Sequence, residues 1–148
     1  MPKKQTLERA RRDKREGKSA STQAGEFVRE EIETIRKGEH GARSTKQAIA
    51  IGLSKARRAG VKLPVPKKGE VPEETRRKAT QDLKKGESEP NAKPSRKRSQ
   101  ATLKALKREG RVAASKQALS RQTRAAARKR SPAERSAAAR KAARTRGE

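Results

Sequence analysis

The sequence predicts a mostly α-helical chain with extensive disorder, in which a small helical hairpin is joined to a basic, helix-prone tail rich in Ala, Arg and Lys. Three observations predict this class. Only 28% of the 148 residues are hydrophobic while 41% are charged, large apolar residues follow helical spacing in one segment alone, and alanine fills the last third. Such a chain buries too little apolar surface to offset the entropy cost of ordering. We therefore expect no single large core.

The N-terminal segment, residues 1–18, is expected to form a basic arm or a marginal helix. It carries eight cations and three carboxylates, with charge on nearly every side. Thr6 is a candidate N-cap, since a hydroxyl can accept a hydrogen bond from a free N–H of the first turn. Gly17 is the expected stop.

Residues 19–63 have the pattern of a helical hairpin. The first helix carries apolar residues at helical spacing and ends at Gly38. The second begins at Ser44, where Gln47 completes a capping box, and ends at Gly60 before two prolines. With nine large apolar residues to bury, the hairpin is expected to be marginally stable, or stabilised by self-association or by DNA.

The remainder divides into a linker, residues 64–98, and a basic C-terminal tail, residues 99–148. The linker contains five of the seven prolines, with room for a short exposed helix over 73–85. In the tail, alanine favours helix over 99–109 and 112–130 but offers little to bury. Ser131 followed by Pro132 and Glu134 predicts the start of one more helix.

The charge of +26 points to a polyanionic partner. Because cationic side chains displace the counterions condensed on DNA, nucleic acid relieves the self-repulsion of such a chain. The excess lies mainly in residues 44–68, which contain no acid, and in residues 96–148, which carry 18 cations against three carboxylates. We expect sequence-nonspecific DNA binding through the phosphate backbone, as in a histone-like or nucleoid-associated protein.

The candidate nucleic-acid contacts fall into two groups. In the hairpin they lie along the polar side of the second helix: Lys46, Lys55, Arg57 and Arg58. In the tail they are spaced by alanines, whose small side chains let a helix approach a groove while cations reach the flanking phosphates: Arg121, Arg124, Arg128, Lys129, Arg130, Arg135, Arg140, Lys141, Arg144 and Arg146.

Catalytic, metal and cofactor sites are not expected, and the protein is interpreted as non-enzymatic. There is no Cys, and the only histidine, His40, is expected to be exposed in a polar turn. The carboxylates of the first hairpin helix are interpreted as solvated charges, including an i,i+4 pair of Glu33 with Lys37, or as partners of the basic second helix: Glu26, Glu30, Glu31 and Glu33. No apolar run is long enough to span a membrane, so we expect a cytoplasmic protein without membrane contact.

Two alternatives stay open. An RNA- or ribosome-associated role fits the same charge, although the chain lacks the aromatic residues that stack on bases. An adaptor is the other, in which the hairpin binds a protein partner while the tails concentrate it on nucleic acid; the acidic first helix motivates this alternative. Charge alone does not choose DNA over RNA.

The second hairpin helix also carries a recognisable motif. Residues 44–60 read STKQAIAIGLSKARRAG. This segment resembles the KQAIAIALSEARKAG motif of an uncharacterised family of small basic bacterial and phage proteins, with Gly52 and Lys55 in place of the usual Ala and Glu. The resemblance implies a bacterial source and no established activity. The C-terminal tail resembles linker-histone tails in composition.

Overall fold

The structure is a computed structural model that describes residues 1–90 and 92–147. Within these ranges the chain forms seven α-helices and one 3₁₀ turn, and the only β-pairing is an isolated bridge between Lys68 and Val71. The elements are α1 (Lys4–Arg15), α2 (Ala20–Arg36), α3 (Thr45–Arg58), α4 (Glu73–Ser88), α5 (Arg96–Lys107), η1 (Val112–Ala114), α6 (Lys116–Arg128) and α7 (Pro132–Gly147).

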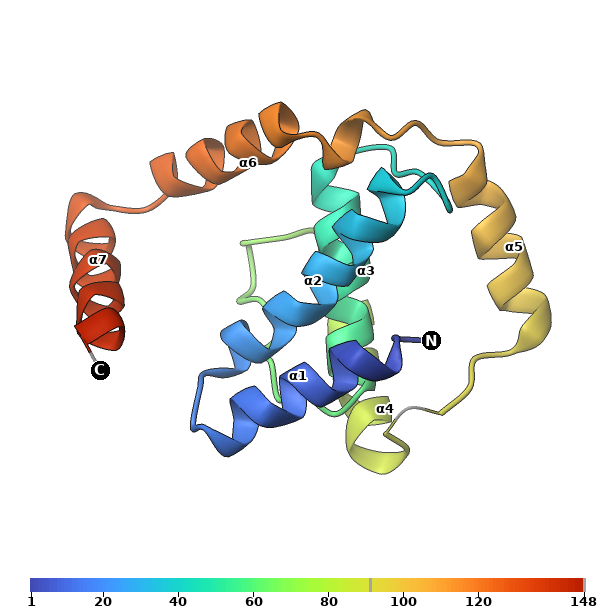
Figure 1. Cartoon of the computed structure of the whole chain (residues 1–148), viewed down its shortest axis with the longest axis horizontal. Helices are drawn as coiled ribbons and strands as arrows, with labels where there is room; N and C mark the ends of the chain where they lie inside the picture. Colours follow the sequence, from blue (N-terminus) through green and yellow to red (C-terminus); the bar gives the residue numbers. More distant parts are fainter. Residues whose placement is uncertain (91, 148) are drawn as a thin grey trace.

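Helices α1 to α4 form the folded body of the molecule (Figure 1). The α2–α3 hairpin is its centre, with α1 packed on α2 and α4 packed on α3. The two hairpin helices approach each other closely at Gly52, where an added Cβ would lie 2.6 Å from the Cα of Val28. A glycine is required there because any side chain would push the helices apart.

Two apolar clusters hold the body together. The first joins α1, α2, α3 and the segment after α3, and is made of Ala10, Ala24, Phe27, Ala56, Val61 and Leu63. The second lies at the turn between α2 and α3 and includes two residues from the C-terminal third of the chain: Ile32, Ile35, Ala42, Ala48, Ala113 and Ala114. Small side chains dominate both clusters, so close backbone approach takes the place of bulky packing.

The expectation of extensive disorder is wrong. The proline-bearing segment contains α4, whose Ala79, Asp82 and Gly86 are buried, and the basic tail contains α5, η1, α6 and α7. Sequence composition missed the contacts that order these parts. Gly86, expected to end a helix, lies inside α4, where its missing side chain lets the helix rest directly on the main chain of Arg57.

The helix-start signals were better guides than composition. Ser44 caps α3 and Ser115 caps α6, each accepting a hydrogen bond from the backbone N–H three residues on. Ser131 and Glu134 form a reciprocal capping box at the start of α7, as predicted. Thr6 does not cap α1, because the helix begins at Lys4 and the Thr6 side chain is buried inside it.

Candidate nucleic-acid interface

Three of the four cations predicted on the hairpin are used inside the fold. The Lys55 ammonium lies 2.6 Å from the Glu31 carboxylate, and the Arg58 guanidinium lies 2.7 Å from that of Asp82 on α4. Arg57 is buried, and its guanidinium donates to the carbonyls of Leu63 and Pro64. These side chains join helices and close a loop. They therefore stabilise the fold, and their charged groups are already occupied by protein partners.

Burial also lowers the pKa of Arg57 below its ordinary value, an effect that the charge of Asp82 partly opposes. A guanidinium in this position is costly to desolvate unless its donors are occupied. Two carbonyl acceptors occupy them here. Among the hairpin candidates only Lys46 is exposed and pairs with no carboxylate among the residues described.

His40 is buried, which corrects the expectation that it faces solvent. Its Nε2 lies 2.9 Å from an oxygen of Glu31, and its Nδ1 lies 2.9 Å from the carbonyl oxygen of Gly41, which can only accept a hydrogen bond. Glu31 itself is fully buried and lies between His40 and Lys55. This cluster ties the α2–α3 turn to α2 and α3.

The other acidic side chains of α2 are also engaged. Glu26 pairs with Arg9 of α1, and both oxygens of Glu30 accept the backbone N–H of Lys3. Glu33 pairs with Arg29 rather than with Lys37. The prediction that acids of the first hairpin helix pair with the basic second helix is confirmed by Glu31 alone.

A short segment of the C-terminal third docks onto the hairpin turn. We call residues 106–115 the clasp. Its carbonyls at Leu106 and Gly110 accept the backbone N–H groups of Gly41 and Ala42, at 2.9 and 3.0 Å. The Ala113 carbonyl accepts the Thr45 hydroxyl at 2.7 Å, and the Ala114 carbonyl accepts the Arg36 Nε at 2.8 Å. The clasp therefore attaches the tail to the body just before α6 begins.

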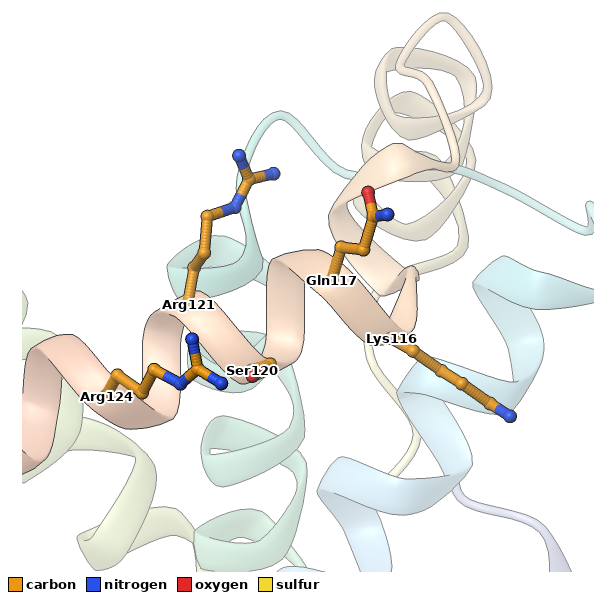
Figure 2. Close-up of a pocket in the computed structure, with 5 residues that line it drawn as sticks. All are labelled: Lys116, Gln117, Ser120, Arg121 and Arg124. Atoms are coloured by element: carbon orange, nitrogen blue, oxygen red, sulfur yellow. The ribbon is translucent and has the colours of Figure 1, made fainter.

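Helix α6 starts beside α3 and extends away from the body (Figure 1), and none of its residues is fully buried. Near its start, Leu119 packs on the second apolar cluster. The side of α6 away from Leu119 holds a shallow hollow of about 470 Å³ lined by Lys116, Gln117, Ser120, Arg121 and Arg124. In Figure 2, Gln117 and Arg121 point to the same side, the Arg124 guanidinium turns toward Ser120, and Lys116 extends the opposite way.

The ten tail candidates are all exposed. Arg121, Arg124 and Arg128 follow one stripe of α6 at helical spacing, while Lys129 and Arg130 lie in the turn before α7. On α7 the cations have no apolar side opposite them, and no residue of that helix is buried: Arg135, Arg140, Lys141, Arg144 and Arg146. The structure thus gives α6 an oriented cationic side and α7 an unoriented one.

Ion pairing separates the two halves of the molecule. Every ion pair among the residues described joins side chains between Lys3 and Asp82. From Arg96 to Gly147, no described cation pairs with a carboxylate, even though this region holds the largest charge excess. The body satisfies its own cations, and the C-terminal helices leave theirs open.

Sequence reasoning missed several important side chains. Glu31 follows Phe27 by four residues and precedes Ile35 by four, so helical periodicity places it on the buried side of α2. That signal was available and pointed to a buried carboxylate with a cationic partner. Two exposed arginines, Arg36 at the end of α2 and Arg111 before η1, were missed because only the clasp brings them together.

Comparison with known proteins finds one similarity. Residues 11–69 match the model of a family of unknown function (DUF6496). The match spans the C-terminal end of α1, the whole α2–α3 hairpin and the segment after it, and stops before α4. No curated protein and no solved structure matches the chain. In the ranges that the structure describes, no helix is both long and apolar enough to cross a membrane, and no group of three potential metal ligands occurs.

Proposed function

We propose that the protein binds DNA without strong sequence preference, through phosphate contacts made by its C-terminal helices. The observation that carries the proposal is the set of exposed cations between Arg96 and Gly147 that pair with no described carboxylate. Unpaired like charges on adjacent helices repel each other, and a phosphate backbone relieves that repulsion while releasing condensed counterions. The role is that of a binding protein rather than an enzyme.

The exposed stripe of α6 that carries Arg121, Arg124 and Arg128 is suited to follow a phosphate backbone. At about 1.5 Å of rise per residue, the stripe from Gln117 to Arg128 is roughly 16 Å long. One DNA strand carries a charge about every 3.4 Å of axis, so several phosphates lie within reach of this length. Arginine favours such contacts because its planar guanidinium donates two parallel hydrogen bonds to a phosphate.

A duplex is favoured over a single strand. Proteins that hold single strands use exposed aromatic rings as stacking platforms. The only aromatic residue, Phe27, is buried in the first apolar cluster. The proposal favours DNA over RNA because an α-helix does not enter the deep, narrow major groove of A-form RNA. A nucleoid location belongs to the same proposal, and a bacterial source is implied by the motif resemblance alone.

A salt titration of binding tests the proposal. Fluorescence anisotropy with a 30-bp duplex of mixed sequence measures the affinity of the full chain from 50 to 200 mM salt. The variant R121Q/R124Q/R128Q is expected to bind more weakly and to reduce the slope of log affinity against log salt by about 2.7, or about 0.9 for each lost phosphate contact. Two unrelated duplexes should bind alike.

The matched control removes the same charge elsewhere. R11Q/K14Q/R15Q changes three exposed cations of α1 that have no ion-pair partner among the described side chains. If both triple variants lose affinity equally, α6 is not the interface. Affinity that does not respond to salt contradicts the proposed function itself. Competition by double-stranded RNA at fixed salt, if stronger than by DNA, replaces DNA with RNA as the ligand.

A further inference from the structure

Two arginines from distant parts of the sequence border one hollow beside the start of α6. Arg36 ends α2 and Arg111 precedes η1, and both line a hollow of about 480 Å³ together with Val112, Ala114 and Ser115. Neither belongs to the candidate contacts identified from the sequence. The clasp alone brings them together, since it places residue 111 beside the end of α2.

Each guanidinium has a defined place. The Nε of Arg36 donates to the Ala114 carbonyl at 2.8 Å, which fixes the plane of the group. A guanidinium carries five N–H donors, so its outer nitrogens keep theirs for a ligand. Arg111 lies across the turn at Gly38, where an added Cβ would be 3.3 Å from its Nη1. Gly38 has φ of +79°, so the turn itself favours a residue without a side chain.

The hollow has the charge and the surroundings of an anion site. No carboxylate lines it, and among the residues described none pairs with Arg36 or Arg111. Val112, 73% exposed, and Ala114 supply apolar walls. Two neighbouring arginines with no carboxylate partner repel each other, and an anion bound between them relieves that repulsion.

We propose that the hollow between Arg36 and Arg111 is a phosphate-binding subsite. Two guanidinium groups match the tetrahedral oxygens of a phosphate better than a flat carboxylate, because each offers paired donors. Ser115, which caps α6, borders the same hollow, so the subsite is continuous with the root of that helix. We take this phosphate to be a phosphodiester of DNA whose backbone continues along α6, and this assignment rests on the function proposed above.

The test compares two double variants of the full chain. R36Q/R111Q removes the subsite, and R11Q/R15Q removes the same charge from the exposed side of α1. With the 30-bp duplex, R36Q/R111Q is expected to reduce the salt slope by about 1.8, or about 0.9 for each arginine, while the control stays close to wild type. R111Q alone keeps the Arg36 bond to Ala114 and should reduce the slope by about 0.9. If wild type binds the duplex, equal slopes in subsite and control variants show that the hollow does not contact the DNA backbone.

A second arm uses inorganic phosphate as the probe. Arginine Nε–Hε signals in ¹H–¹⁵N spectra should shift for Arg36 and Arg111 on titration with phosphate, and chloride at equal ionic strength should not move them. Shifts with phosphate but no binding of duplex by wild type keep the subsite, as a site for free phosphate, and reject the proposed function. Absence of these shifts together with equal salt slopes rejects the subsite while leaving DNA binding by α6 intact.

Discussion

Replacing Gly41 by alanine should release the clasp without unfolding the body. Gly41 lies in the α2–α3 turn, and its backbone φ is not in the left-handed region, so alanine is compatible with its own conformation. The steric clash is with the clasp, because an added Cβ would fall on the main chain of Glu109 and Gly110. Backbone cannot swing aside as a side chain does, so the clasp must move.

The loss in docking free energy can be worked out from the two hydrogen bonds on either side of this clash. The N–H groups of Gly41 and Ala42 donate to the carbonyls of Leu106 and Gly110 at 2.9 and 3.0 Å. Losing two such bonds costs about 1–3 kcal/mol, and overpacking adds roughly 1–3 kcal/mol. We expect a loss of about 2–6 kcal/mol in docking free energy, which is roughly a 30- to 20,000-fold change in the docking equilibrium.

Hydrogen exchange measures this change locally. The Ala42 amide is protected only while the clasp is docked, so G41A should speed its exchange by at least about 30-fold, as expected for opening of one local unit. The control is G110A, also in the clasp, where an added Cβ meets nothing within 4 Å. If Ala42 in G41A stays as protected as in G110A, the clasp is not docked in the way the structure shows.

Three further outcomes follow from the same contacts. Glu31→Ala should lower the free energy of unfolding in urea by about 3–5 kcal/mol, because it strands the cation of Lys55 beside a buried His40, whereas Glu33→Ala at an exposed pair should cost less than about 1 kcal/mol. Gly52→Ala should lower the thermal unfolding temperature through a loss of about 1–3 kcal/mol, since its Cβ would sit 2.6 Å from Val28 Cα, while the open position Gly25→Ala should raise it. The pKa of Glu134 lies below its ordinary 4.5 because the backbone and hydroxyl of Ser131 bond the carboxylate. The stabilisation that Glu134 gives the first turn of α7 is therefore complete above about pH 4.5 and is lost as pH falls through the lowered pKa. Amide exchange in α7 measured against pH detects this loss, and exchange that is unchanged down to strongly acid pH would contradict it.

Local signals predicted the helices well, because each depends on neighbours in the sequence. The capping serines at 44 and 131 act within a single turn, and the glycine after α2 has the left-handed φ that ends a helix. Alanine content predicted helix in the tail for the same reason. Each signal is complete within about four residues, so no tertiary contact is needed to recognise it.

Long-range contacts explain what the sequence did not reveal. Composition predicted a linker over 64–98 with a short exposed helix at most, yet α4 is packed on α3, where Asp82 reaches Ser54 and Arg58. The clasp is ordered through four of its carbonyls, and a backbone acceptor leaves no mark on a residue pattern. Alanines 113 and 114 read as tail sequence but are core residues.

The candidate site shows the same division. Lys55, Arg57 and Arg58 were predicted to contact DNA because they share the polar side of a helix, but their partners Glu31, Leu63 and Asp82 occupy them. Periodicity tells which side of a helix a cation is on and not whether an acid from another helix meets it. The tail predictions stay untested, although their exposure and lack of described partners fit the proposal.

The clasp also separates two explanations of binding that total charge cannot distinguish. G41A leaves the net charge of +26 unchanged and removes only the attachment of α6 to the body. If binding depends on net charge, the affinity for the 30-bp duplex is unaltered. The alternative is that binding depends on the clasp holding the α6 stripe and the Arg36–Arg111 hollow in one fixed arrangement. In that case G41A must order the released helix again when it binds DNA, and affinity should fall about tenfold, or roughly 1.4 kcal/mol. G110A should bind like wild type, and a G41A affinity equal to both would show that the cations act as a tail and that their placement by the clasp has no part in recognition.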